Sequence, residues 1–336
     1  MSQVGDTPAQ STLASIGLRL SDWFERWFPD AFALALLAVA IVFAATLATG
    51  ASVAQSAQWF GSGFWDLVAF TMQMSMIIVT GYAVATSAPV YAVIRWMAAI
   101  PKTGRGAAAY VGLFSMLASL VSWSFSLIFS GLLAREVTHR VRGADYRAVG
   151  AAAYLGVGSV WALGLSSSAA LIMAAPASLP DAIERISGTI PLSQTLGLWQ
   201  SVLIAGLLIV VSMLVSYYSA PAPAQARGMA EMGVTYQPAS PDVGRVEKPG
   251  EWLEYSPFLT IVICALGFGY LAREVVTLGP GILLELNHYV FAFLMVGLLL
   301  HWRPRSFVNA IAGAVAPVGG VLIQYPLYAG IVKMMT

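Results

Sequence analysis

The chain has 336 residues, of which 58% are hydrophobic and only 10% are charged, and its mean hydropathy is +0.77. Soluble domains carry about 25% charged residues, so this composition excludes a soluble globular protein and predicts an integral membrane protein. The net charge of +1 gives no basis for nucleic-acid binding, one cysteine excludes disulfides, and three scattered histidines argue against a metal site.

Residues 1–30 are predicted to be a polar tail followed by an amphipathic helix on the membrane surface. From Ile16 to Trp27 the apolar residues share one helical face, and Pro29 ends the pattern. A first membrane repeat is then predicted over residues 31–218. Its simple crossings are expected at 31–50, 67–85 and 198–218, with an uncharged loop at 50–63.

The uncharged stretch 107–134 presents a topological problem, because basic residues precede it up to Arg105 and follow it from Arg135 to Arg147. Cytoplasmic loops collect lysine and arginine, so a simple crossing would put one basic loop on the wrong side. We therefore expect a re-entrant hairpin of two half-length helices, each of about 14 residues. The alternative is an ordinary crossing with a weak charge bias.

The tip of this hairpin is predicted at the polar and aromatic run from Ser122 to Ser126. If the N-terminus is cytoplasmic and the segment is a hairpin, 14 of the 17 lysines and arginines lie on the cytoplasmic side. No arrangement that treats the segment as a crossing does as well.

The uncharged run 148–176 is predicted to be a helix that is broken at Gly164-Leu165-Ser166-Ser167-Ser168. Glycine loosens the backbone, and three hydroxyls in a row can bond local amides in place of the helix ladder. An opened backbone at this depth is tolerated where it faces protein or a cavity, as at the substrate sites of transporters. The alternative is a continuous helix whose serines bond back to carbonyls one turn earlier.

Residues 219–254 contain five prolines and mixed charges, which predict a cytoplasmic linker that acts as a flexible joint. An incomplete second membrane repeat is expected over 255–336. Its crossings are predicted at 256–272, 283–300 and 307–332, and Pro317 and Pro326 should kink or interrupt the last of them. The counterparts of the hairpin and of the broken helix are lacking, so we expect a transporter without its C-terminal part.

The hairpin tip and the helix break would bring hydroxyls, freed amides and positive helix N-termini to one place. Such a place suits a short carboxylate, with aromatic side chains as the apolar wall. Two amides deep in apolar runs could join it, although an interhelical hydrogen bond is the plainer interpretation of each. The candidate substrate-binding residues are Ser122, Trp123, Ser124, Phe125, Ser126, Gly164, Ser166, Ser167, Ser168, Gln73 and Gln324. No catalytic residue and no metal ligand is predicted.

Several motifs resemble one family. They are Asp22-Trp23-Phe24-Glu25-Arg26-Trp27-Phe28-Pro29-Asp30, Phe64-Trp65-Asp66-Leu67, Phe70-Thr71-Met72-Gln73-Met74, Ile77-Ile78-Val79-Thr80-Gly81, Ser87-Ala88-Pro89, Ala134-Arg135-Glu136-Val137 and Gln324-Tyr325-Pro326-Leu327-Tyr328-Ala329-Gly330. Together, and in this order, they resemble the bacterial short-chain fatty acid transporters of the butyrate and acetoacetate uptake type. The resemblance implies an all-α polytopic membrane protein with an inverted-repeat ion-transporter-like architecture, a re-entrant hairpin and broken transmembrane helices.

The leading hypothesis is therefore a secondary transporter in the bacterial inner membrane that imports short monocarboxylates by alternating access. H⁺ or Na⁺ is the coupling ion to be expected, with no other cofactor. The partners are the short-chain carboxylate and the lipid bilayer, with no nucleic acid, and a homodimer is an open option. The alternatives are a membrane-embedded acyl or glycosyl transferase, another anion or cation carrier of the same superfamily, and an assembly subunit without a site.

Overall fold

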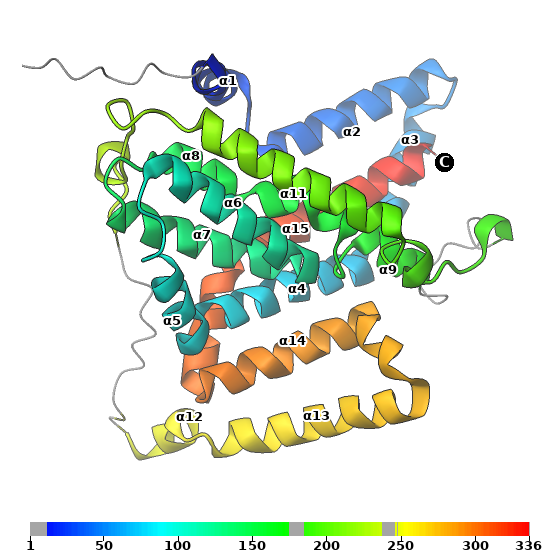
Figure 1. Ribbon diagram of the computed structural model, residues 1–336. Helices are drawn as coiled ribbons and strands as arrows, with labels where there is room; N and C mark the ends of the chain where they lie inside the picture. Colours follow the sequence, from blue (N-terminus) through cyan, green and yellow to red (C-terminus); the bar gives the residue numbers. More distant parts are fainter. Residues whose placement is uncertain (1–11, 175–184, 237–245, 247, 336) are drawn as a thin grey trace, which may run out of the picture.

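The computed structural model describes residues 12–174, 185–236, 246 and 248–335, and within these ranges the chain forms helices and no strands (Figure 1). Six helical segments among the described residues are long and apolar enough to cross a membrane. They are Ala31–Ala48, Val68–Thr86, Gly104–Val121, Trp199–Ser219, Pro249–Leu278 and Val318–Met335, and Leu286–His301 is a shorter apolar helix. The prediction of an all-α polytopic membrane protein is confirmed.

Three helices form the N-terminal part: α1 (Thr12–Trp27), α2 (Ala31–Ala48) and α3 (Val53–Gly63). The loop predicted at 50–63 is wrong, because most of it is α3. A capping box begins this helix, in which the Ser52 hydroxyl accepts from the Gln55 amide N–H at 3.2 Å and the Gln55 side chain accepts from Ser52 N–H at 2.9 Å. Paired capping of this kind starts a helix whether or not the stretch is charged.

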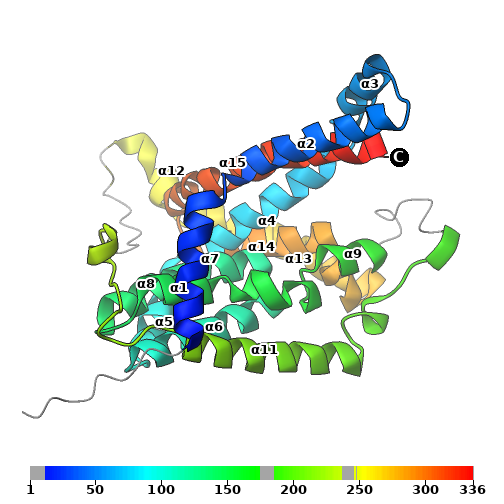
Figure 2. The same cartoon turned by 90° about the horizontal axis from the view of Figure 1, so that it is seen from above.

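Helix α4 (Val68–Thr86) lies at the centre of the molecule. It packs against α14 (Leu286–His301) and α15 (Pro304–Met335), and also against α7 (Trp123–Arg140) (Figure 1). Helix α5 (Ala88–Met97) follows α4 directly and packs against α7. At the other end of the chain, the part of α15 nearest the C-terminus lies beside α2 and α3 (Figure 2).

The stretch predicted as a hairpin consists of α6 (Gly104–Val121) and α7, which pack on each other. The two ends meet, because a Cβ at Gly104 would collide with the backbone carbonyl of Gly143. The predicted leg length of about 14 residues is too short, since each helix has 18 residues. The legs were expected to end where charged residues begin. Instead, α6 already begins at Gly104 and includes Arg105, and α7 continues past Arg135 and Glu136 to Arg140. Re-entry into a membrane stays a prediction.

Helices α8 (Tyr146–Ala153) and α11 (Trp199–Ser219) pack on α6, and α9 (Ser168–Ala174) begins beyond the interrupted stretch. On the other side of the molecule, α12 (Trp252–Tyr255) leads into α13 (Phe258–Leu278), which packs against α14 (Figure 1).

The linker is more ordered than the predicted flexible joint, although residues 237–245 and 247 lie outside the described part. Ala220, Ala222 and Met229 are buried. Arg227 N–H donates to the Asp145 carboxylate at 3.0 Å, and the carbonyl of Arg227 accepts from Tyr146 N–H at 2.8 Å. Buried acids near the base of the hairpin need donors, and the linker supplies them.

Helix α15 is continuous over 32 residues, so of the kink or interruption predicted at Pro317 and Pro326 the interruption does not occur. Its ribbon bends instead, between the orange and the red part (Figure 1). Prolines are tolerated inside membrane helices where neighbouring groups bond the carbonyls they leave free.

Candidate functional site

The run between α8 and α9 is not a regular α-helix. After α8 it passes through a π-helical turn (Gly156–Val160) and a short 3₁₀ turn (Trp161–Leu163). The backbone then becomes extended at Gly164, with φ −97° and ψ 166°, before α9 begins at Ser168. The break therefore lies at the glycine and serines that the sequence indicates.

The turn between α6 and α7 is a single residue, Ser122, in extended conformation with φ −151° and ψ 120°. Its hydroxyl accepts from Phe125 N–H at 3.3 Å and so caps the N-terminus of α7. Serine at this position satisfies one of the free amides of the new helix.

The hairpin tip and the helix break are bonded to each other. Trp123 N–H donates to the Ser166 hydroxyl at 2.9 Å, and Leu165 N–H donates to the Leu120 carbonyl at 2.7 Å. The approach is so close that a Cβ at Gly164 would lie 2.6 Å from the carbonyl oxygen of Ser119. Only glycine fits there.

A third segment reaches the same point. Tyr289, on α14, donates its hydroxyl to the Val121 carbonyl at 3.2 Å, and this hydroxyl also contacts the hydroxyls of Ser122 and Ser166. Sequence reasoning missed Tyr289. The available signal was a tyrosine inside an apolar run, which is the same signal that singled out Gln73.

Two of the predicted substrate contacts are engaged in helix packing. The Ser124 hydroxyl donates to the Ile77 carbonyl on α4 at 2.8 Å, and the Ser126 hydroxyl donates to the Ser115 carbonyl on α6 at 2.7 Å. Phe125 stacks on Phe129 at 5.3 Å. These three side chains hold the hairpin to itself and to α4 in this conformation.

The predicted amides are not partners of each other. Gln73 Nε2 donates to Asn287 Oδ1 on α14 at 2.8 Å, which is the interhelical hydrogen bond left open as the plainer interpretation. Gln324 lies half-buried on α15. The ring next to it, Tyr325, stacks on Phe70 of α4 at 5.8 Å.

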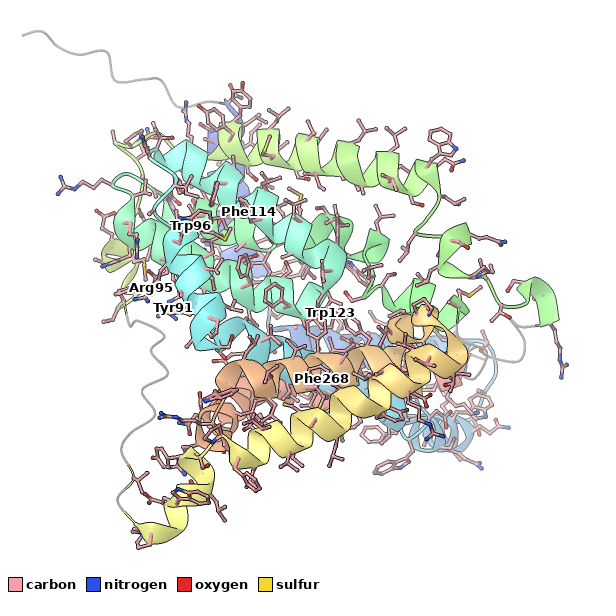
Figure 3. The ribbon with its side chains drawn as sticks, turned by 60° about the horizontal axis from the view of Figure 1, so that its bottom comes forward. Tyr91, Arg95, Trp96, Phe114, Trp123 and Phe268 are labelled. Atoms are coloured by element: carbon pink, nitrogen blue, oxygen red, sulfur yellow. The ribbon has the colours of Figure 1, made fainter. Side chains whose placement is uncertain are left out.

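The remaining candidates lie around the meeting point. Ser167 is buried and its hydroxyl accepts from Ala170 N–H at 3.4 Å, whereas the side chain of Ser168 lies outside the described part. Trp123 is half-buried and lies between the hairpin and α14 (Figure 3). The buried hydroxyl of Ser119 has no hydrogen-bond partner among the described residues, so it is a free polar group beside the break.

The electrostatics of this meeting point depend on dipoles. No Asp, Glu, Lys or Arg lies in 107–134 or in 148–180, and the N-terminus of α7 points at the cluster of Ser122, Ser166 and Tyr289. A helix N-terminus and hydroxyl donors bind a small anion without a buried cation. Among the described residues no group of three His, Cys, Asp or Glu side chains could hold a metal ion.

A buried pair of fixed charges lies at the opposite end of the hairpin. Asp145 is buried, caps α8 and pairs with Arg147 at 2.7 Å. Burial alone would raise the pKa of this carboxyl, but hydrogen bonds from Arg147, Arg227 N–H and Ala148 N–H outweigh burial and lower the pKa below its usual value.

Comparison with known sequences places this geometry in context. The sequence profile of the family described as "Short chain fatty acid transporter" matches residues 12–336. A protein of Escherichia coli named "Putative short-chain fatty acid transporter" is 35% identical over 319 residues, which cover 94% of this chain and 71% of that protein. A protein of the same name from Haemophilus influenzae is 29% identical over 323 residues, with the same two coverages. No solved structure matches the chain at a significant level.

Proposed function

Because the chain belongs to the short chain fatty acid transporter family, we propose that it imports short monocarboxylates such as butyrate or acetoacetate by alternating access, coupled to the entry of a cation. Membership of this family makes the chain a transporter and not an enzyme, which sets the transferase alternative aside. The setting that we propose is the bacterial inner membrane, with a cytoplasmic N-terminus.

One observation carries the proposed substrate: serine hydroxyls cap the N-terminus of α7 where it meets the helix break. Trp123 N–H bonds to Ser166 and Phe125 N–H bonds to Ser122. A carboxylate oxygen is a stronger acceptor than a hydroxyl, so it can take over these amides while the serines and Tyr289 donate to it. The acid is then held by several charge-assisted hydrogen bonds.

The length of the acid is limited by the same surroundings. Trp123 lies beside the donors, and the backbone of Leu120 and Ser119 closes over Gly164. A short alkyl chain would pack against the Trp123 ring once the site opens, whereas each added methylene needs more room. We propose that this is the reason for a preference for short acids.

The serines of the cluster are almost inaccessible, with Ser122 and Ser166 each 1% exposed. A substrate therefore enters only when the tip of the hairpin and the helix break separate. Alternating access is a movement of this kind, in which the site opens to one side at a time. Breaking the bonds from Trp123 to Ser166 and from Leu165 to Leu120 would open it.

The test is uptake of labelled butyrate by cells that express the complete gene, because the chain covers 71% of the length of each relative. Ser166→Ala removes an anion donor, and a lost hydrogen bond to a charged group costs about 1.5–3 kcal/mol, so KM should rise about tenfold or more. Ser126→Ala is the matched control, since its hydroxyl is engaged by the Ser115 carbonyl within the hairpin. It should lower stability and leave KM unchanged.

Two results would contradict the proposal. An uptake rate equal to that of cells without the gene would reject a carrier of short monocarboxylates, and uptake of other anions or cations in the same cells would point to another carrier of the superfamily. An unchanged KM in Ser166→Ala would remove the hairpin tip from the substrate site.

A further inference from the structure

One buried acidic side chain has no part in the substrate site. Glu136 lies on α7, and it is only 2% exposed. Fourteen positions separate it from Ser122, so it lies roughly 21 Å along the helix from the hairpin tip. Carboxylates are rarely buried to this extent without partners. Glu136 therefore needs an explanation of its own.

One oxygen of Glu136 joins three segments of the chain. Oε1 accepts from the hydroxyl of Tyr91 on α5 and from the hydroxyl of Tyr236 in the linker, the latter at 2.7 Å. Tyr91 lies on α5 at the opposite end of the hairpin from Trp123 (Figure 3). Burial raises the pKa of Tyr236, and its bond to Glu136 raises it further, so this hydroxyl stays protonated and donates.

The other oxygen accepts no hydrogen bond from the described residues, but it faces an arginine. Oε2 is buried and has no hydrogen-bond partner among the described residues. Its nearest opposite charge is the Arg140 guanidinium, 3.6 Å away on a side chain that is 39% exposed. A proton placed on Oε2 would displace no hydrogen bond.

Charged and titratable groups lie near Glu136 on α7 itself, on α5 and in the linker. Arg135, His139 and Arg140 are close on α7, Tyr91 and Arg95 are on α5, and Tyr236 is in the linker. The exposed His139 ring stacks on Tyr236 at 3.8 Å, and Arg95 lies over the Tyr91 ring at 5.6 Å. His139 and Tyr236 thus form a polar path from solvent to the carboxylate.

We propose that Glu136 is the acceptor of the coupling proton, an inference that rests on the proposed function and names its coupling ion. The step is the transfer of one proton from water to Oε2, which turns the carboxylate into a neutral acid. A protonated acid accepts weaker hydrogen bonds, and it no longer attracts Arg140. The hydrogen bonds that join Glu136 of α7 to Tyr91 of α5 and to Tyr236 of the linker weaken, and the hairpin becomes free to move.

The charges explain the coupling. Of the two negative charges that the proposed cycle involves, those of Glu136 and of the substrate, the empty carrier holds the first, and the carrier loaded with a monocarboxylate and a proton holds the second. Substrate without a proton would put two negative charges on the same hairpin, and a proton without substrate would leave none. A sodium ion fits less well, since it needs several oxygen ligands and the neighbouring hydroxyls of Tyr91 and Tyr236 are already hydrogen-bonded to Oε1.

The experiment uses the protein from the complete gene, purified and reconstituted into vesicles. Labelled acetoacetate is the probe, because it is a stronger acid than butyrate and crosses lipid more slowly. Two rates are measured and corrected for protein-free vesicles: uptake driven by acid outside, and exchange of internal for external acetoacetate at equal pH. Glu136→Gln removes the proton acceptor, and Glu254→Gln removes an exposed glutamate that pairs with Arg305 at 3.0 Å.

Glu136→Gln should exchange acetoacetate at the wild-type rate and lose the acceleration by acid outside, whereas Glu254→Gln should retain both. Acid-driven uptake by Glu136→Gln at the wild-type rate would overturn the proposal. Absence of exchange in the wild type would instead reject the proposed substrate.

A second readout does not depend on transport. Infrared difference spectra of the wild type between neutral and acid pH should contain a protonated-carboxyl band that is absent from Glu136→Gln. Spectra without such a band would overturn the proposal, even if the variant proved too unstable for transport.

Discussion

The hydroxyl of Tyr289 on α14 donates to the carbonyl of Val121, the last residue of α6, across 168 positions of sequence. This bond brings α14, which lies in the predicted second repeat, to the tip of the hairpin, which lies in the predicted first repeat. The same hydroxyl touches Ser122 and Ser166, so three segments share one small polar cluster. A movement that separates any of them changes the whole cluster.

We expect Tyr289→Phe to weaken carboxylate transport. The loss of one hydrogen bond costs about 0.5–1.5 kcal/mol, so KM should rise about 2- to 10-fold while the amount of protein in the membrane stays normal. Tyr270→Phe is the control, because this tyrosine of α13 bonds His288 of α14 at 3.2 Å, so the change removes a hydroxyl bonded to the same helix but outside the cluster. Equal KM values for Tyr289→Phe and the wild type would exclude Tyr289 from the site.

The hairpin topology is tested by labelling from each side of the membrane. Lys102→Cys and Arg142→Cys are suitable because both native side chains are exposed, whereas Gly104 and Gly143 press on each other. Cys264 is buried and is replaced by alanine in the background. Both new cysteines should react with an impermeant maleimide from the cytoplasmic side, and Arg273→Cys from the opposite side. Reaction of positions 102 and 142 from opposite sides would establish an ordinary crossing.

The contact between α4 and the hairpin tip depends on Gly81. A Cβ there would collide with the Ser124 hydroxyl and lie 2.8 Å from the Phe125 amide nitrogen. Overpacking of this kind costs about 1–3 kcal/mol, so Gly81→Ala should lower the Tm in detergent. Gly131→Ala, on α7 with open space around it, should raise stability by up to about 1 kcal/mol. A Tm that is unaffected by Gly81→Ala would show that the tip adjusts at no cost.

The buried Asp145 makes stability depend on pH. Its pKa is lower in the folded protein than in the unfolded chain, so its contribution is complete above the ordinary carboxyl pKa and is lost as the pH falls through the lower, folded value. Asp145→Asn should reduce the free energy of unfolding at neutral pH by about 1–3 kcal/mol. The difference from the wild type should shrink below about pH 4.

Thermal unfolding across this pH range is the measurement, with Asp66→Asn as the control. Asp66 is exposed and lies 3.8 Å from Lys333, so its replacement should change little at any pH. A constant difference between Asp145→Asn and the wild type from neutral to acid pH would mean that the charge of Asp145 is irrelevant to stability.

Local composition determined the class of this protein and most of its helices. The uncharged runs predicted the crossings at 67–85 and 198–218 to within one residue of α4 and α11, because length and hydropathy are properties of a segment alone. The break at Gly164 was equally local, since glycine and consecutive serines weaken a helix wherever it lies. The uncharged stretch 50–63 is mostly helix and not the predicted loop, because the capping box of Ser52 and Gln55 begins α3 there.

Only the tertiary structure decided what the polar side chains do. Ser122 and Ser126 look alike in sequence, yet one caps α7 beside Ser166 while the other fixes α7 to α6. Tyr289 and Glu136 gain their roles from partners that lie far away in the chain. A hydroxyl or carboxylate bonds whichever group packing brings within about 3 Å, and the order of residues does not contain that distance.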